Sequence, residues 1–275
     1  MVRYMKVPDR SFLPAFSLLL IVLFTVSCGG GNEPEPVERR DVLHIAAASN
    51  LSYVMPQLIE EFKARNGEYM HSDIKVTKAS SGSLTAQIRN NAPFAVFLAA
   101  NKAYPLALFR DSLTVGPPVV YAEGLPVMVY KKELACRTGV DCLAGSSVKR
   151  VAIAQPDLAP YGKAALDILE RAGVLEEVRG KIVFGASVTQ AFQHATTAAD
   201  AGFIAASLLY GDSGKQLDEA GMVRMDFAPE DYTASVLQQG MVLLDPSSVI
   251  AASFFRFMQS ESAGEVLRQY GYRVE

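Results

Sequence analysis

Short apolar runs alternate along the chain with segments in which apolar residues recur at helical spacing. Ala95–Ala99 is apolar throughout, as in a buried parallel strand, whereas Ile74–Lys78 alternates like a half-buried strand. Helical spacing follows such runs, for example over Leu51–Arg65 and Lys163–Gly173. Strands that alternate with helices predict an α/β architecture with parallel sheets and right-handed crossovers.

Four strand-to-helix junctions are rich in small and hydroxyl-bearing residues. They are His44–Leu51, Ala79–Leu84, Gln155–Gly162 and Gly185–Thr189. A helix start offers free N–H groups and the positive end of the helix dipole, which together suit an anion. One such turn alone most often binds nothing. Ligands of open α/β sheets lie beyond the carboxyl ends of the strands, where all four junctions are expected, so together they predict one shared cleft.

Two extended stretches, 121–130 and 227–237, are suited to crossings between two lobes. We therefore expect lobe I to comprise residues 41–125 plus 232–275, and lobe II to comprise residues 126–231. Each lobe is predicted to be a mainly parallel sheet flanked by helices, with the ligand cleft between the lobes and two junctions from each.

The N-terminus has the composition of a secretory signal. Three basic residues precede the apolar run Phe12–Val26, which is too short to be a good membrane span. The run ends at Ser27-Cys28-Gly29, which resembles a bacterial lipobox in which Cys28 is lipidated and becomes the new N-terminus; ordinary signal cleavage nearby is the alternative. We expect residues 1–28 to be the signal peptide and residues 29–40, rich in Gly, Pro and Glu, to be a flexible tether.

The charge balance argues against a nucleic-acid partner. The formal net charge of the chain is −3, and it becomes −5 when residues 1–27 are removed, because that segment holds three basic residues and one acidic residue. No basic surface is implied. The histidines, His44, His71 and His194, are scattered and are expected to be surface or hydrogen-bonded residues rather than metal ligands.

Two further cysteines, Cys136 and Cys142, are separated by five residues in a glycine-containing loop. A disulfide persists in an exported protein, so we expect these two to be paired. A metal site is the weaker alternative, since no histidine lies near them and two thiols do not close a zinc site.

The serine-rich turns carry no accompanying catalytic motif. Ser49, Ser81 and Ser187 are candidate nucleophiles, but the sequence contains no Gly-x-Ser-x-Gly elbow, no Walker-type loop and no His-Glu-x-x-His. We predict an extracytoplasmic binding protein for a small oxyanion, with no catalytic residue and no cofactor. A serine-dependent hydrolase and a passive structural lipoprotein are the alternatives.

Several segments, in order over about residues 42–272, are similar to the periplasmic molybdate-binding proteins of ABC transporters. They are Ala46–Ser49, Ala79–Leu84, Asn91–Pro93, Val96–Leu98, Gln155–Gly162, Ser187–Ala191, Gly202–Ala205 and Tyr270–Tyr272. The resemblance implies a two-lobed type II binding protein that closes on molybdate or tungstate and delivers it to a membrane permease. The protein is then expected in the periplasm or cell envelope, as a monomer anchored by the lipid on Cys28.

The resemblance also implies a set of oxyanion contacts. Carried over by position, they fall on Ser49, Asn50, Ser81, Tyr161 and Val188, with Val188 acting through its backbone. Molybdenum enters only inside the oxyanion and has no direct protein ligand.

The chain departs from the family pattern along the run 95–101. Ala95 and Asn101 stand where the family usually has Asp, and Ala99 stands where it usually has Ser or a similar residue. The wall behind the site is therefore expected to differ. Another small oxyanion or an organic solute is the alternative ligand.

Overall fold

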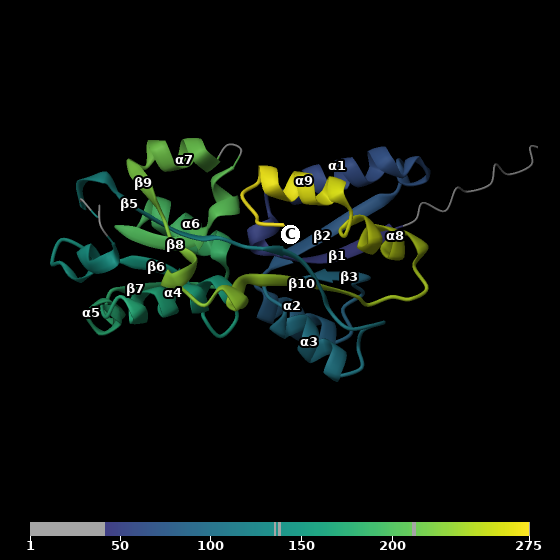
Figure 1. Ribbon diagram of the computed structural model, residues 1–275, viewed down its shortest axis with the longest axis horizontal. Helices are drawn as coiled ribbons and strands as arrows, with labels where there is room; N and C mark the ends of the chain where they lie inside the picture. The colour runs from purple at the N-terminus through teal and green to yellow at the C-terminus, as the bar shows by residue number, and fades with distance from the viewer. Residues whose placement is uncertain (1–41, 135, 137–138, 211–212, 275) are drawn as a thin grey trace, which may run out of the picture. The chain divides into compact units, whose positions relative to one another are not determined.

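The computed structural model describes residues 42–134, 136, 139–210 and 213–274. The expected signal peptide, tether and lipidated Cys28 lie outside the described residues. The ten strands form two five-stranded sheets (Figure 1). The first contains, in spatial order, β2 (Asp73–Ala79), β1 (Val42–Ala48), β3 (Val96–Leu98), β10 (Gln238–Leu243) and β4 (Val119–Glu123). The second contains β7 (Ile182–Gly185), β6 (Val151–Ala154), β8 (Ala201–Ala205), β5 (Pro126–Lys131) and β9 (Met222–Asp226).

Strand direction confirms the predicted α/β class with mainly parallel sheets. In the first sheet β2, β1 and β3 run in parallel, and β10 is antiparallel to both of its neighbours, so four strands share one direction. The second sheet repeats this pattern, with β5 as the antiparallel strand between β8 and β9. The antiparallel strand in each sheet is the one that directly follows a crossing between the sheets.

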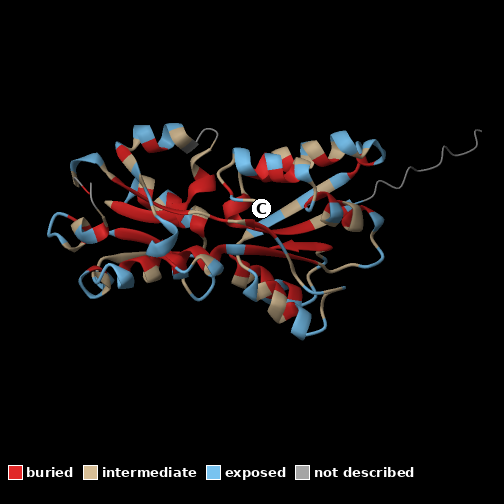
Figure 2. Cartoon of the chain, in the orientation of Figure 1, coloured by how far each residue is buried: buried red, intermediate tan, exposed pale blue. Residues whose placement is uncertain are grey.

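Lobe I is built on the first sheet and has apolar cores on both of its faces. Alternate residues of one strand enter different cores: Leu43 and Ile45 of β1 lie in one, and Ala46 lies in the other. Helices α1 (Met55–Arg65), α8 (Val249–Phe257) and α9 (Glu261–Gln269) cover the first core, and α2 (Ser81–Arg89) and α3 (Ala103–Arg110) cover the second. Figure 2 shows the resulting pattern, in which buried strands lie beneath helices whose outer faces are exposed.

Lobe II is built on the second sheet around one large apolar core. Helices α4 (Pro160–Arg171) and α6 (Val188–Thr197) bury their apolar faces in it. Two short helices, α5 (Leu175–Arg179) and α7 (Ser213–Glu219), lie where the sequence pattern predicts none. A disulfide joins Cys136 to Cys142 at the edge of this core, with their Cα atoms 5.3 Å apart.

The chain crosses between the sheets twice, and the two crossings differ in length. The first crossing is Gly124 and Leu125, between β4 and β5, and the second crossing is residues 227–237, between β9 and β10. The exact lobe boundaries, expected after residues 125 and 231, stay a prediction. Gly124 N–H donates to the carbonyl of Leu237 over 3.0 Å, so the two crossings touch.

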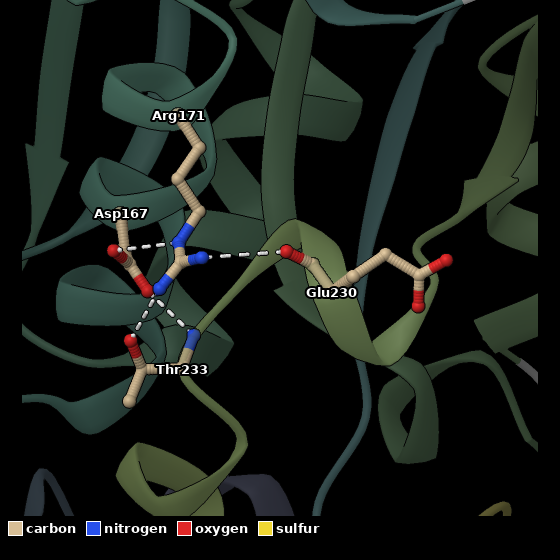
Figure 3. Close-up of polar contacts among 4 residues, drawn as sticks. All are labelled: Asp167, Arg171, Glu230 and Thr233. Atoms are coloured by element: carbon tan, nitrogen blue, oxygen red, sulfur yellow. Dashed lines mark hydrogen bonds and ion pairs between the residues drawn. The ribbon is translucent and has the colours of Figure 1, made fainter.

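The second crossing is held against α4 by polar contacts (Figure 3). Thr233 N–H donates to Asp167 Oδ2 over 2.5 Å, and Arg171 Nη2 donates to the Thr233 hydroxyl over 2.9 Å. Arg171 also binds Asp167 Oδ1 and the carbonyl of Glu230. These contacts fix the middle of a segment that holds only two short 3-10 turns, Pro229–Asp231 and Ala234–Leu237.

The prediction that the first helix begins directly at Leu51 is wrong. Ser49–Leu51 forms a 3-10 turn, and α1 begins at Met55 with Pro56 in its first turn. A proline fits there because its missing N–H has no partner in the first turn of a helix. Ser49 and Asn50 therefore do not cap a helix with their side chains. Within the part of the chain that the structure describes, no helix is long and apolar enough to cross a membrane.

Candidate functional site

A small pocket lies between the lobes at the carboxyl ends of β1 and β6. Lobe I supplies Ala48, Ser49, Asn50, Ser80, Ser81 and Ala100, and lobe II supplies Ala159, Pro160, Tyr161 and Val188. The structure thus brings together all five residues on which the sequence predicts oxyanion contacts. Their role in binding stays a prediction.

The pocket is small and neutral. Its volume is about 10 Å3, whereas pockets for drug-sized organic ligands measure roughly 300–1,000 Å3. No charged side chain is among the described residues that line it. The first turns of α2, α4 and α6 supply Ser81, Pro160, Tyr161 and Val188. Three helix N-termini therefore direct their positive dipole ends and free N–H groups at one small space.

Ser81 has its hydroxyl oriented by the backbone. The side chain is 1 % exposed, and its Oγ accepts a hydrogen bond from Ala100 N–H over 2.9 Å. The proton of the hydroxyl is then available to donate to another acceptor. Ser49, on the facing turn, is also buried, and its carbonyl accepts from the Thr189 hydroxyl of lobe II over 2.9 Å.

Tyr161 is a hydrogen-bond donor at every physiological pH. Burial raises the pKa of its hydroxyl well above the ordinary value, and the neighbouring hydroxyls of Tyr272 and Tyr121 raise it further, against a smaller opposing effect of the Gln239 hydrogen bond. The hydroxyl oxygen accepts from Gln239 Nε2 over 3.3 Å, so its own proton is free for another partner.

Val188 contributes backbone rather than side-chain chemistry. It is the first residue of α6, whose N-cap Ser187 accepts from Gln190 N–H over 3.2 Å. The cap satisfies the N–H of the third helical residue and leaves that of Val188 without an intrahelical acceptor.

Asn50 belongs to a buried polar network behind the pocket. Its Nδ2 donates to Gln239 Oε1 over 3.0 Å and to the Tyr272 hydroxyl over 2.9 Å. Its carbonyl accepts from the hydroxyls of Tyr272 and Ser207. Both amide protons are thus used within the network, and Asn50 Oδ1 is buried with no hydrogen-bond partner among the described residues. The backbone N–H is the donor that Asn50 has left for a ligand.

Sequence reasoning missed Gln239, Tyr121 and Ser207, which complete this network. Six of the eight buried polar residues that the structure describes line the pocket or bond to Asn50, namely Ser49, Asn50, Ser80, Ser81, Ser207 and Gln239. The one available signal was a glutamine in the otherwise apolar extended segment Gln239–Leu244.

The lobes bond to each other around the pocket. Gly82 N–H donates to the carbonyl of Leu158 over 2.9 Å, and the Tyr104 hydroxyl donates to the carbonyl of Asp157 over 2.9 Å. Together with the contacts of Thr189 and Ser207 to lobe I, these bonds surround the site. A bound ion would therefore contact both lobes at once.

The three departures from the family pattern do not line the pocket. Ala99 is buried in the second core of lobe I, and its carbonyl accepts from the Tyr121 hydroxyl over 3.2 Å. Asn101 Oδ1 accepts from Tyr104 N–H at the start of α3. Ala100, between them, is the residue of this run that the pocket shares. The departures thus alter the surroundings of the wall and leave the donors in place.

Within the described residues, neither a histidine nor a metal-binding cluster contributes to the pocket. None of the three histidines is among the residues that line the pocket, within the described chain. No cluster of three or more His, Cys, Asp or Glu able to hold a metal ion occurs in residues 42–134, 136, 139–210 and 213–274. The pocket offers neutral donors, and these suit an anion.

Comparison with known proteins agrees with this geometry. The family model described as "Bacterial extracellular solute-binding protein" matches residues 43–273. The molybdate-binding protein ModA of Azotobacter vinelandii is 31% identical over 95% of this chain and 100% of its own length, and that of Rhodobacter capsulatus is 32% identical over 71% and 75%.

A solved structure, the periplasmic molybdate-binding protein of Azotobacter vinelandii, superposes with a TM-score of 0.73 at 26% identity. The match covers 85% of this chain and 99% of that one. The resemblance predicted from the motifs is confirmed, and so is the two-lobed fold. The chain belongs to the bacterial extracellular solute-binding proteins.

Proposed function

We propose that the protein captures molybdate in the pocket between its lobes and delivers it to the permease of an ABC importer. The observation that carries the proposal is a small neutral pocket on which three helix N-termini converge. The relatives that bear the name molybdate-binding protein support the identity of the ion.

Hydrogen bonds alone are sufficient to hold a dianion in such a pocket. An ion taken out of water must regain its hydrogen bonds, and N–H and O–H donors supply them without a buried counter-charge. Bonds to charged groups contribute about 1.5–3 kcal/mol each. Roughly six of them offset desolvation and leave the ~8–12 kcal/mol that corresponds to micromolar to nanomolar affinity.

The pocket does not support the alternative of a serine hydrolase. A serine nucleophile needs a base within hydrogen-bond reach. Ser81 Oγ instead accepts from a backbone N–H, and the described pocket lining holds no His, Asp, Glu or Lys. We therefore assign binding rather than catalysis to this chain.

Competition calorimetry with molybdate, tungstate, sulfate and phosphate tests the proposed function. Phosphate carries a proton near neutral pH and needs an acceptor, and a ring of donors supplies few. Sulfate is smaller, so donors fixed by helix starts lie too far from its oxygens for hydrogen bonds of full strength. We expect molybdate and tungstate to bind at least roughly a hundredfold more tightly than sulfate. Displacement of molybdate by sulfate at comparable concentration would overturn the proposal.

The variant Ser81→Ala is predicted to weaken molybdate binding by roughly tenfold to a hundredfold, because it removes a donor that faces a desolvated anion. Titration calorimetry measures the affinity, and thermal unfolding checks that the variant folds. Ser248→Ala is the matched control, since Ser248 caps α8 in lobe I and does not line the pocket. Unchanged affinity in folded Ser81→Ala would remove Ser81 from the site.

We also propose that the protein is exported as a monomer and is held at the cell envelope by lipid on Cys28. Support comes from the signal-like N-terminus and its lipobox-like end. The intact mass of the mature protein tests the anchor, because a diacylglyceryl group and loss of residues 1–27 give a mass that simple cleavage does not.

A further inference from the structure

In the buried network behind the pocket, each hydrogen bond of Gln239 has an assigned donor and acceptor. Gln239 Oε1 accepts from Asn50 Nδ2 over 3.0 Å and from the Tyr121 hydroxyl over 2.8 Å. The Tyr121 hydroxyl has a single proton, and its shorter contact, to Gln239 rather than to the carbonyl of Ala99, assigns Oε1 to this end of the amide. The Nε2 end of Gln239 must then face the Tyr161 hydroxyl, to which it donates over 3.3 Å.

This arrangement determines where the Tyr161 proton points. A hydroxyl that accepts from an N–H donates its own proton in another direction. Tyr161 lines the pocket, and two neighbouring hydroxyls use their protons in other bonds: Tyr121 with Gln239, and Tyr272 with the carbonyl of Asn50. The Tyr161 proton has no acceptor among the described contacts, and an ion bound in the pocket would supply one.

The bond between Gln239 and Tyr161 also joins the two lobes. Gln239 lies on β10 of lobe I, directly after the second crossing, and is fully buried; Tyr161 lies in the first turn of α4 in lobe II. Gly124 of the first crossing packs against the same contact, since a Cβ there would overlap both the Tyr161 hydroxyl oxygen and Gln239 Nε2. The contact therefore requires the two lobes to lie close together, with both crossings packed beside it.

We propose that Gln239 is a positioning residue for oxyanion binding: it does not line the pocket, but it turns the Tyr161 hydroxyl proton toward the ion and makes that orientation depend on the approach of the lobes. The inference rests on the proposed function, because Tyr161 must be a ligand donor for its orientation to matter.

A double-mutant cycle on molybdate affinity tests the role of Gln239, with the full-length protein titrated by calorimetry. Gln239→Met keeps side-chain length and removes both polar ends, and we expect it to weaken binding roughly tenfold. In a Tyr161→Phe background the same change is expected to alter affinity less than twofold, because no hydroxyl remains to be oriented. A purely structural role for Gln239 gives equal losses in both backgrounds, and that result overturns the proposal.

Gln239→Glu sharpens the test by reversing the direction of the bond. A carboxylate accepts from Tyr161, draws its proton away from the pocket and places a negative charge beside the ion, so binding is expected to fall at least roughly a hundredfold. Gln259→Met is the matched control, because Gln259 lies outside the pocket and the network, and its side chain donates to the carbonyl of Phe255.

Tyr121→Phe keeps the proposal testable if Gln239→Met does not fold. It removes one of the two donors that hold Gln239 Oε1, and we expect affinity to fall about threefold in the wild type and to stay unchanged in the Tyr161→Phe background. Tyr69→Phe is its control, since the Tyr69 hydroxyl bonds to Ser253 in the first core of lobe I. Equal affinity of wild type and Tyr121→Phe overturns the inference alone, whereas a wild type that binds no molybdate overturns the proposed function as well.

Discussion

The two crossings between the lobes are built from opposite kinds of contact. The first crossing, Gly124 and Leu125, packs against buried neutral groups, the Tyr161 hydroxyl and the Gln239 amide. The second crossing, residues 227–237, is held on the surface by the ion pair of Arg171 and Asp167 (Figure 3). Both sets of contacts are made with one helix, α4, at its first turn and further along it.

The first crossing is therefore coupled to the ligand site, whereas the polar contacts of the second crossing serve to stabilise the fold. The first crossing adjoins a side chain that lines the pocket, so a change there alters the donors themselves. The polar contacts of the second crossing with α4 are partly exposed, and exposed ion pairs stabilise a fold by only about 0–1 kcal/mol. We therefore expect changes at the first crossing to act on affinity and changes at the second crossing to act on stability.

Of the two crossings, the first is predicted to give the larger effect, through Gly124→Ala. The added methyl group overlaps the Tyr161 hydroxyl and the Gln239 amide, so one of them must move and the bond between them is lost. Molybdate affinity is expected to fall at least roughly tenfold, with a loss of about 1–3 kcal/mol in the free energy of unfolding. Calorimetry and denaturant unfolding measure the two quantities.

Gly116→Ala provides the control for that substitution, because a Cβ at Gly116 meets nothing within 4 Å. It is expected to leave affinity unchanged. If Gly124→Ala binds molybdate as tightly as the wild type, the first crossing is not coupled to the ligand and the comparison fails.

A smaller effect is predicted for Asp167→Asn at the second crossing. Burial tends to raise the pKa of this carboxyl, but hydrogen bonds from Thr233 and Arg171 outweigh it and hold the pKa below its usual value of 3.8. A lowered pKa in the folded state stabilises the protein above the unfolded pKa, and this stabilisation is lost as the pH falls through the folded pKa. The variant is expected to lose about 0.5–1 kcal/mol of stability at pH 7.

The pH dependence checks the origin of that loss. The difference in unfolding free energy between Asp167→Asn and the wild type should begin to shrink below about pH 4, where the carboxyl of the unfolded chain takes up a proton. It should vanish only when the pH lies below the lowered pKa of the folded state, where the carboxyl is protonated in both states. Molybdate affinity at pH 7 should change less than twofold. A tenfold loss of affinity would show that the second crossing acts on the site as well.

The smallest effect is predicted for pH itself on molybdate binding. The pocket lining contains no group that titrates between pH 6 and 9, because burial keeps the pKa of Tyr161 well above its ordinary value. Affinity measured by calorimetry should therefore be constant over this range. A slope of one proton per ion would identify a titrating group at the site and contradict its neutral character.

Much of the fold follows from local sequence patterns. The apolar run 95–99 contains β3, and Pro160 begins α4 as its missing N–H suggests. The order of strands and helices then fixes the α/β class. Short elements such as α5 escape this reasoning, because five residues hold too few apolar positions to show a period.

The residues that line the pocket could be predicted from the sequence, whereas the network behind them could not. Ser81, Tyr161 and Val188 lie at helix starts. The residue types at these strand-to-helix junctions predict helix N-termini with free N–H groups. Asn50 and Gln239 are 189 residues apart, and their bond forms because β10 returns to the first sheet after the chain has passed through lobe II. No local pattern encodes such a contact, so the donor direction within the network required the folded chain.

A binding protein must also release its ligand, and the uncharged lining of the pocket affects how easily the ion leaves. When an ion leaves a pocket built around an arginine or lysine, the abandoned cation stays behind in a low-dielectric space, which is strongly unfavourable. The hydroxyls and N–H groups of this pocket carry no net charge, and water satisfies them as soon as the lobes part. Discharge to a permease would then require only the opening of the cleft, with no compensating anion to take the place of the one released.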